Sequence, residues 1–170
     1  MTLAELNRLA AAAFVDKLGA VFEHSPWVAQ RAYDRRPFGS IDELHRAMMS
    51  VVLDARPTEQ LLLLCAHPEL AGAEARQGTL TVHSTGEQAR LGLNALSRDE
   101  FRRIGEINRG YFRKFGFPCI VALKLHASRD NVLAEMERRL ANSREEELRT
   151  ALEQIGHITR GRLDQMFGGH

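Results

Sequence analysis

The sequence predicts an all-α protein, a single-domain bundle of about eight helices that extends over residues 1–170. Three observations support this fold class. Helix-capping patterns recur along the chain, apolar residues repeat at steps of three and four, and the alternation of apolar and polar residues that marks β-strands is almost absent. A chain of 170 residues is also long enough to bury one hydrophobic core.

Five segments have the pattern of a capping box, in which a serine or threonine is followed three residues later by a glutamate. The hydroxyl accepts a hydrogen bond from the third helical amide, and the carboxylate accepts one from the amide of the capping residue. We expect a helix to begin at each of them, namely at Thr2, Ser40, Ser84, Ser97 and Ser143.

Apolar periodicity places further helices in the first part of the chain. Residues at helical spacing predict helices within 14–22, 26–33 and 44–52. Thr58 is expected to cap the next helix, which should end at Ala66 because Pro68 disfavours its continuation.

The second part of the chain contains two long apolar stripes. They predict helices over 101–115 and 148–166. Between them, residues 117–125 are apolar but have no hairpin partner, so we expect an irregular segment that leads into a helix at about Asp130. Gln77-Gly78 is expected to form a loop.

Composition excludes several classes of function. The net charge is +1 and charges of both signs are interspersed, so neither a basic face nor nucleic-acid binding is expected. The two cysteines, Cys65 and Cys119, form no CxxC pair. The apolar run 61–66 is too short to cross a membrane, and charged residues interrupt residues 1–14. A cytoplasmic protein without membrane contact is expected.

His67 is the first candidate catalytic residue. It follows an apolar helix and precedes Pro68, so its imidazole should lie at the C-terminal end of that helix. Histidine titrates near neutral pH and can exchange a proton with a substrate oxygen. A helix-capping or surface histidine is the alternative.

The Ser84-Thr85-Gly86-Glu87-Gln88 turn is the second candidate. A helix N-terminus can bind a substrate carboxylate or a polarised carbonyl, and Gln88 adds an amide donor and acceptor. Glu87 could equally serve only as the glutamate of the capping box.

Two further segments could contact a ligand. The apolar stretch Cys119-Ile120-Val121-Ala122-Leu123 has backbone groups that need partners if they are buried, and a small polar ligand could supply them. Near the C-terminus, Arg160 or Arg162 could bind a carboxylate through paired hydrogen bonds, although a solvated arginine is the ordinary alternative. No metal-ligand spacing and no glycine-rich phosphate loop is present, so an acid-base site without metal or cofactor is expected.

Taken in order, the motifs resemble the 2-oxo-4-hydroxy-4-carboxy-5-ureidoimidazoline (OHCU) decarboxylase family of urate breakdown. The resemblance covers nearly the whole chain, and the ordered set is more specific than any one motif. Its main segments are Phe22-Glu23-His24-Ser25-Pro26-Trp27, Arg36-Pro37-Phe38, His67-Pro68-Glu69-Leu70-Ala71-Gly72, Glu87-Gln88, Lys114-Phe115-Gly116-Phe117-Pro118, Arg139-Leu140-Asn142 and Arg162-Leu163.

The resemblance implies an all-helical, commonly dimeric enzyme that forms (S)-allantoin and carbon dioxide without metal or organic cofactor. His67 would be the acid-base group, and Glu87 would orient and polarise the substrate. Pocket residues would be Pro68, Ser84, Thr85, Gly86, Gln88, the backbone of Cys119, Ile120, Val121, Ala122 and Leu123, and Arg162, which would bind a negatively charged or carbonyl part of the ligand.

Two positions depart from the family pattern. Cys119 stands where an aromatic residue is usual, and Gly161 replaces the common leucine before Arg162, which leaves Arg160 and Arg162 as alternatives. The implied partner is a small-molecule ureidoimidazoline substrate, with a homodimer and neither nucleic acid nor membrane. The alternative function is a helical binding or regulatory module that has kept this fold and lost turnover.

Overall fold

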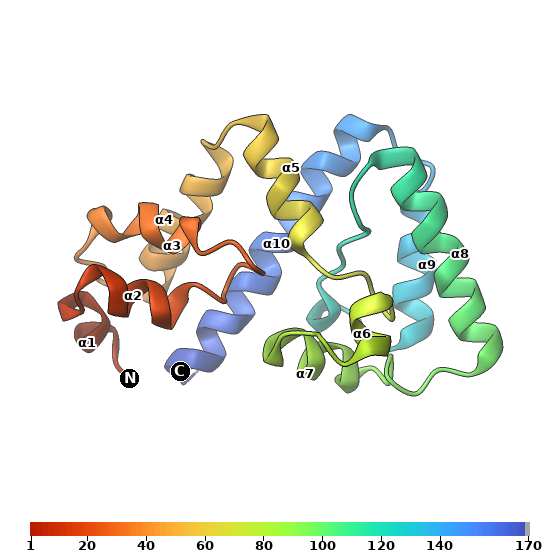
Figure 1. Cartoon of the computed structure of the whole chain (residues 1–170), viewed down its shortest axis with the longest axis horizontal. Helices are drawn as coiled ribbons and strands as arrows, with labels where there is room; N and C mark the ends of the chain where they lie inside the picture. Colours follow the sequence, from red (N-terminus) through yellow and green to blue (C-terminus); the bar gives the residue numbers. More distant parts are fainter. Residues whose placement is uncertain (169–170) are drawn as a thin grey trace. The chain divides into compact units, whose positions relative to one another are not determined.

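The computed structural model describes residues 1–168 and confirms the all-α class (Figure 1). Within these residues there are ten α-helices, two short 3-10 turns and no strand. The chain divides into two compact units, Met1–Ala66 with Thr159–His170, and His67–Ile158. Helix α10, Arg144–Phe167, contributes its first part to the second unit and its last part to the first.

The first unit contains α1 to α5. Their bounds are Leu3–Arg8 for α1, Ala11–Leu18 for α2, Trp27–Ala32 for α3, Ile41–Leu53 for α4 and Pro57–Ala66 for α5, and the 3-10 turn η1, Tyr33–Arg35, follows α3. Helix α3 packs against both α2 and α4. Phe14 of α2 meets Tyr33 edge to face at 5.4 Å between ring centroids.

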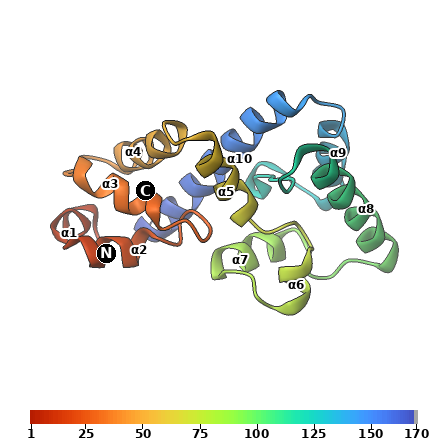
Figure 2. The ribbon, with the colours of Figure 1, turned by 45° about the horizontal axis from the view of Figure 1, so that its top comes forward.

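The second unit contains α6 to α9. Their bounds are Ala73–Gln77 for α6, Val82–Arg90 for α7, Arg98–Phe115 for α8 and Arg129–Arg139 for α9, and the 3-10 turn η2, Leu123–Leu125, precedes α9. Helices α8 and α9 lie side by side in both views (Figures 1 and 2). Tyr111, Phe115 and Phe117 form an aromatic cluster with ring centroids 4.4 to 6.2 Å apart.

Most of the predicted helix starts are confirmed. Thr2 and Ser97 form complete capping boxes, and Ser143 exchanges reciprocal hydrogen bonds with Glu146 at 2.7 and 3.1 Å. Ser40 caps α4, but the Glu43 carboxylate accepts from Gly39 instead of from Ser40. Residues 117–125 are irregular as expected, and α9 begins at Arg129, one residue from the predicted start.

Two predicted helix starts are wrong. Helix α7 begins at Val82, and the capping hydroxyl belongs to Thr81, so Ser84 and Glu87 lie inside the helix. Helix α5 begins at Pro57, before Thr58. Proline is well suited to the first helical position because its fixed φ is helical and the amide hydrogen it lacks would have no intrahelical partner there.

Two other expectations need correction. The helix expected within residues 14–22 ends at Leu18, since Gly19 follows and the chain then turns, with His24 at a φ of 48°. Val21 and Phe22 are buried nonetheless. The short helix α6 was not expected. It ends at Gln77 and is capped by Gly78 of the predicted loop, where the φ of 69° favours glycine.

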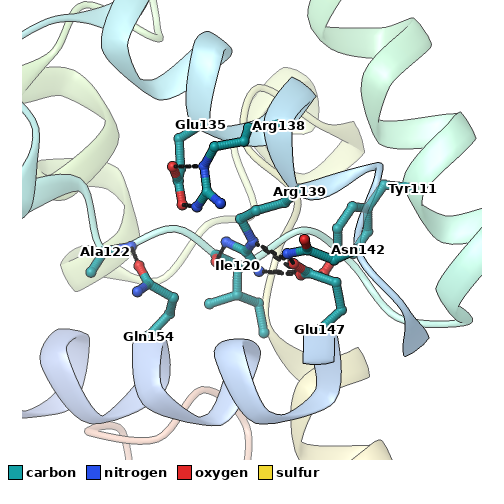
Figure 3. Close-up of polar contacts among 9 residues, drawn as sticks. All are labelled: Tyr111, Ile120, Ala122, Glu135, Arg138, Arg139, Asn142, Glu147 and Gln154. Carbon is teal, nitrogen blue, oxygen red and sulfur yellow. Dashed lines mark hydrogen bonds and ion pairs between the residues drawn. The ribbon is translucent and has the colours of Figure 1, made fainter. Parts of the chain in front are cut away.

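A buried ion pair joins α9 to α10 inside the second unit (Figure 3). The side chains of Arg139 and Glu147 are both 0% exposed, and three nitrogen-to-oxygen contacts of 2.7 to 3.1 Å join them. Asn142 also donates to Glu147 at 2.9 Å, and the Tyr111 hydroxyl donates to the same carboxylate. Burial raises the pKa of Glu147, but these hydrogen bonds outweigh it and leave the pKa below its ordinary value.

Replacing Glu147 with glutamine should strongly destabilise the protein. Because Arg139 would remain buried without its counter-charge, we expect Glu147→Gln to lower the free energy of unfolding by about 3 kcal/mol. Urea denaturation followed by far-ultraviolet circular dichroism measures this change. The exposed neighbour Glu145 offers a matched control, since Glu145→Gln should change stability by no more than about 0.5 kcal/mol. If the two variants were equally stable, the stabilising role of the buried Arg139–Glu147 ion pair would be contradicted.

The Arg139–Glu147 pair should also make the free energy of unfolding depend on pH in the acidic range. A carboxyl whose pKa is lower in the folded state stabilises the protein fully above its unfolded pKa, and this contribution is lost as the pH falls through the folded pKa. We therefore expect the free energy of unfolding to fall below about pH 4.5, the ordinary value for glutamate. Urea denaturation at stepped pH should show a shallower fall for Glu147→Gln than for the unchanged protein.

Candidate active site

The motif that contains His67 forms a loop directly after α5. The helix ends at Ala66 as predicted, and His67 is buried, with 8% of its surface exposed. The side-chain oxygen of Gln88 in α7 accepts from the Ala71 amide at 3.0 Å, and the Asn108 amide of α8 donates to the Leu70 carbonyl at 2.9 Å. The loop is thus fixed to two helices.

At position 72 of this loop there is room only for glycine. A Cβ atom at this position would lie 2.7 Å from the Cβ of Glu69, closer than side chains tolerate. Ala71 just before it has a φ of 49°, in the left-handed region. The Leu70-Ala71-Gly72 part of the motif therefore sets the backbone path of the loop.

The predicted residues of α7 divide between two faces of the helix. Ser84, Glu87 and Gln88 are three and four positions apart and share one face, on which Ser84 and Gln88 are buried and Glu87 is half-buried. Thr85 and Gly86 are exposed. Since Gln88 also bonds Ala71, the hydrogen bond connects the helix that carries Glu87 to the loop that begins at His67.

Residues Cys119, Ile120, Val121, Ala122 and Leu123 are all buried. Much of their backbone has partners within the protein. Arg139 donates to the Ile120 carbonyl at 2.5 Å, the Ala122 amide donates to Gln154 of α10 at 2.8 Å, and Arg90 donates to the Leu123 carbonyl. Several of these backbone groups, for which we had considered a ligand as the partner, therefore bind protein side chains instead.

The two arginines near the C-terminus differ in environment. Arg162 is 1% exposed and donates to the Val21 carbonyl at 3.1 Å and to the Glu23 carboxylate at 3.0 Å, all within the first unit. Arg160 is partly exposed and forms ion pairs with Asp42 and Asp164. The buried arginine is thus Arg162, and Glu23 orients it.

The second unit contains two cavities near the loop. One, of about 430 Å³, is lined by Glu69, Gly72, Asn108 and three arginines, Arg76, Arg102 and Arg109. Burial raises the pKa of Glu69. The other, of about 360 Å³, is mainly apolar and is lined in part by Thr85 and Gln88. Neither His67 nor Glu87 lines these two cavities.

Sequence reasoning missed three polar side chains around these segments. Asn108, Arg139 and Gln154 bind backbone groups of the loop and of residues 119–123. Arg139 does lie in a segment that carries the family resemblance, which was the available signal, but nothing in the sequence marks Gln154.

Metal-ligand clusters and membrane-spanning helices are absent from the part of the chain that the structure describes. No group of three or more histidine, cysteine, aspartate or glutamate side chains within residues 1–168 is arranged to hold a metal ion. In the same part of the chain, no helix combines the length and the apolar character needed to span a bilayer.

The fold and these segments define an all-helical protein in which a buried histidine follows a helix end and begins a loop, and a hydrogen bond joins that loop to a helix that carries a glutamate. The family model described as OHCU decarboxylase matches residues 7–164. The chain therefore belongs to the OHCU decarboxylase family, as the ordered motifs predicted.

Individual relatives agree with this assignment. The 2-oxo-4-hydroxy-4-carboxy-5-ureidoimidazoline decarboxylase of Haloferax volcanii is 42% identical, over 98% of this chain and 96% of its own length. The mouse protein of the same name is 36% identical, over 100% of this chain and 95% of its own.

Solved structures agree at the level of the fold. A crystal structure of (S)-allantoin synthase matches with a TM-score of 0.78 and 28% identity over 97% of this chain. The match covers 54% of that protein, so this chain spans about half its length. A crystal structure of OHCU decarboxylase in the presence of (S)-allantoin has a TM-score of 0.68 and 20% identity, over 84% of this chain and 91% of its own, which supports the fold alone.

The two cysteines should differ in reactivity. Cys119 is buried, and burial raises the pKa of its thiol to about 12, so it carries almost no thiolate at neutral pH. Cys65 is exposed. We expect Ellman's reagent to modify one thiol per folded chain at pH 8 and two after denaturation. Cys65→Ser should abolish the reaction of the folded protein, and a reaction that survives this change would show that Cys119 is accessible.

Proposed function

We propose that this chain catalyses the decarboxylation of OHCU to (S)-allantoin and carbon dioxide in urate catabolism. The observation that carries the proposal is the match to relatives named for this activity over nearly the whole chain, with His67 and Glu87 both present. A protein that only binds a ligand has no need of this acid-base pair, so the inactive alternative has no observation in its favour.

The chemistry requires stabilisation of negative charge. When the carboxylate leaves as carbon dioxide, the bonding electron pair stays on the former carboxyl-bearing carbon and can delocalise into the adjoining imidazoline. Fixed hydrogen-bond donors aimed at the ring heteroatoms lower this barrier. The hydroxyl on that carbon then loses its proton as the carbon becomes a carbonyl, and a proton is added to the neighbouring ureido-bearing carbon, which completes the reaction. A positioned proton donor contributes typically about 10²–10⁴-fold to such a step.

His67 is the proposed acid-base group that engages the substrate hydroxyl, and Glu87 orients and polarises the substrate. The burial of His67 and the anchored loop after it support this role, because a catalytic group must be held in place. Glu87 shares its helix face with Ser84 and Gln88, which we assign to substrate binding. The exposed Thr85 and Gly86 contribute the local backbone of α7.

The remaining proposed contacts come from other segments. Pro68 and the backbone of residues 119–123 line the pocket, and Arg162 binds the negatively charged or carbonyl part of the ligand. The bond from Arg162 to Glu23 supports this assignment over Arg160, since it orients a buried guanidinium. A chiral pocket of this kind protonates one face of the ring and so yields a single enantiomer.

We also propose a working form for the protein. Residues 1–170 act as one OHCU decarboxylase-like domain, in the cytoplasm, as a homodimer, with neither metal nor organic cofactor and without nucleic acid or membrane partners. Size-exclusion chromatography with light scattering tests the dimer, and activity after dialysis against a chelator tests independence from metal.

Activity is tested with substrate made freshly by hydrolysis of 5-hydroxyisourate. Circular dichroism at the allantoin band should show rapid formation of the (S) enantiomer. His67→Gln should lower kcat at least about 100-fold, because the proton donor is lost. His157→Gln, a change at an exposed histidine of α10, should leave the rate unchanged. A His67→Gln protein with the original rate would exclude the proposed role, and racemic allantoin from a fully active enzyme would exclude the chiral pocket.

A further inference from the structure

Residues 118–122 form a buried segment without regular secondary structure, and two side chains hold its backbone (Figure 3). Arg139 comes from α9 and donates to the Ile120 carbonyl at 2.5 Å. Gln154 comes from α10 and accepts from the Ala122 amide at 2.8 Å. The two contacts lie one residue on either side of Val121.

These contacts fix both peptide groups of Val121. A trans peptide unit is planar, and its C=O and N–H point in opposite directions. The only cis bond within residues 1–168 is Arg36-Pro37. The bond to the Ile120 carbonyl therefore aims the Val121 N–H away from Arg139, and the bond to the Ala122 amide aims the Val121 C=O away from Gln154.

The Val121 backbone is left without protein partners by this arrangement. Neither its N–H nor its C=O makes a hydrogen bond within residues 1–168, although the residue is only 2% exposed. Buried backbone groups are nearly always paired, and those that lack a protein partner are paired with water or a ligand. A donor and an acceptor on one residue complement a ring amide or ureido group, which carries an N–H beside a C=O.

Arg139 is itself held rigidly. Its contacts with the buried Glu147 use the Nε and Nη2 atoms, while Nη1 reaches Ile120. Asn142 and Tyr111 hold the carboxylate from other directions. The guanidinium therefore has a fixed position, and so does the peptide group that it binds.

We infer that Arg139 and Gln154 are positioning residues of the decarboxylation, which orient the Val121 backbone toward the amide-type edge of the substrate. This inference rests on the proposed function, since it takes residues 119–123 as a wall of the substrate pocket. It adds two side chains that act through the backbone and do not touch the ligand.

Gln154 gives the sharper test because it is half-buried and makes one hydrogen bond to the segment, whereas changes at Arg139 also break an ion pair. Gln154→Met keeps the length of the side chain and removes the acceptor. We expect it to weaken (S)-allantoin binding, measured by calorimetry, and to lower kcat/KM, each by about five- to tenfold. Gln154→Glu keeps an acceptor oxygen and should restore both quantities to within about threefold of the original.

Gln165→Met is the matched control, a change of the same kind at an exposed position of α10, and it should alter neither quantity. Thermal unfolding of all variants separates positioning from loss of fold. If Gln154→Met lowers only the unfolding temperature and leaves binding and kcat/KM unchanged, the inference is overturned. Equal losses in Gln154→Met and Gln154→Glu would also overturn it, since the acceptor would then be irrelevant.

The unchanged protein decides the proposed function separately. If it does not decarboxylate OHCU, the proposed function fails before any variant is compared. If the unchanged protein decarboxylates OHCU, and Gln154→Met and Gln154→Glu both bind (S)-allantoin and turn over substrate as it does, only the positioning inference fails.

Discussion

The buried ion pair between Arg139 and Glu147 is the interaction on which the second unit depends. Removing two charges from water is costly, and the cost is met only where geometry and additional hydrogen bonds are favourable. Here the carboxylate binds Arg139, Asn142 and Tyr111, and the guanidinium uses a further nitrogen to bind a backbone carbonyl. One pair therefore links α8, α9, α10 and the irregular segment before η2.

Side chains from helices also hold the irregular backbone of the loop after α5. Two side-chain amides, from Gln88 and Asn108, bind neighbouring peptide groups of the loop from two helices. In both places an irregular backbone is fixed by side chains from regular helices, which is how a helical scaffold can hold a loop in a defined position. The proposed acid-base residue stands at the start of one of these segments, and the proposed pocket backbone forms the other.

Local chemistry explains which parts of this structure were predictable. Capping at Thr2, Ser97 and Ser143 and the helix end before Pro68 depend on residues close in sequence, and each was predicted correctly. The start of α7 was not, because Thr81 caps the helix without the glutamate that would complete a capping box. Helix α6 has only five residues, too few to show periodicity.

The candidate site was predictable to a similar extent. The position of His67 at a helix end followed from Pro68, and the family followed from the order of the motifs. The side chains that hold the backbone of residues 119–123 could not be predicted, because Arg139 and Gln154 bind residues that lie 19 and 32 positions away in the sequence. No spacing rule along one helix connects such residues.

The anchoring of residues 119–123 through main-chain atoms has a consequence for divergence among related proteins. Every residue type except proline offers the same N–H and C=O, so the side chains in this segment can change as long as they still fill the interior. Cys119, for which the family resemblance led us to expect an aromatic residue, is buried, and the anchored peptide groups are those of its neighbours Ile120 and Ala122. Substitutions of Arg139 and Gln154 would remove the side chains that bind this backbone. We therefore expect these positions of α9 and α10 to vary less among related proteins than the segment that they hold.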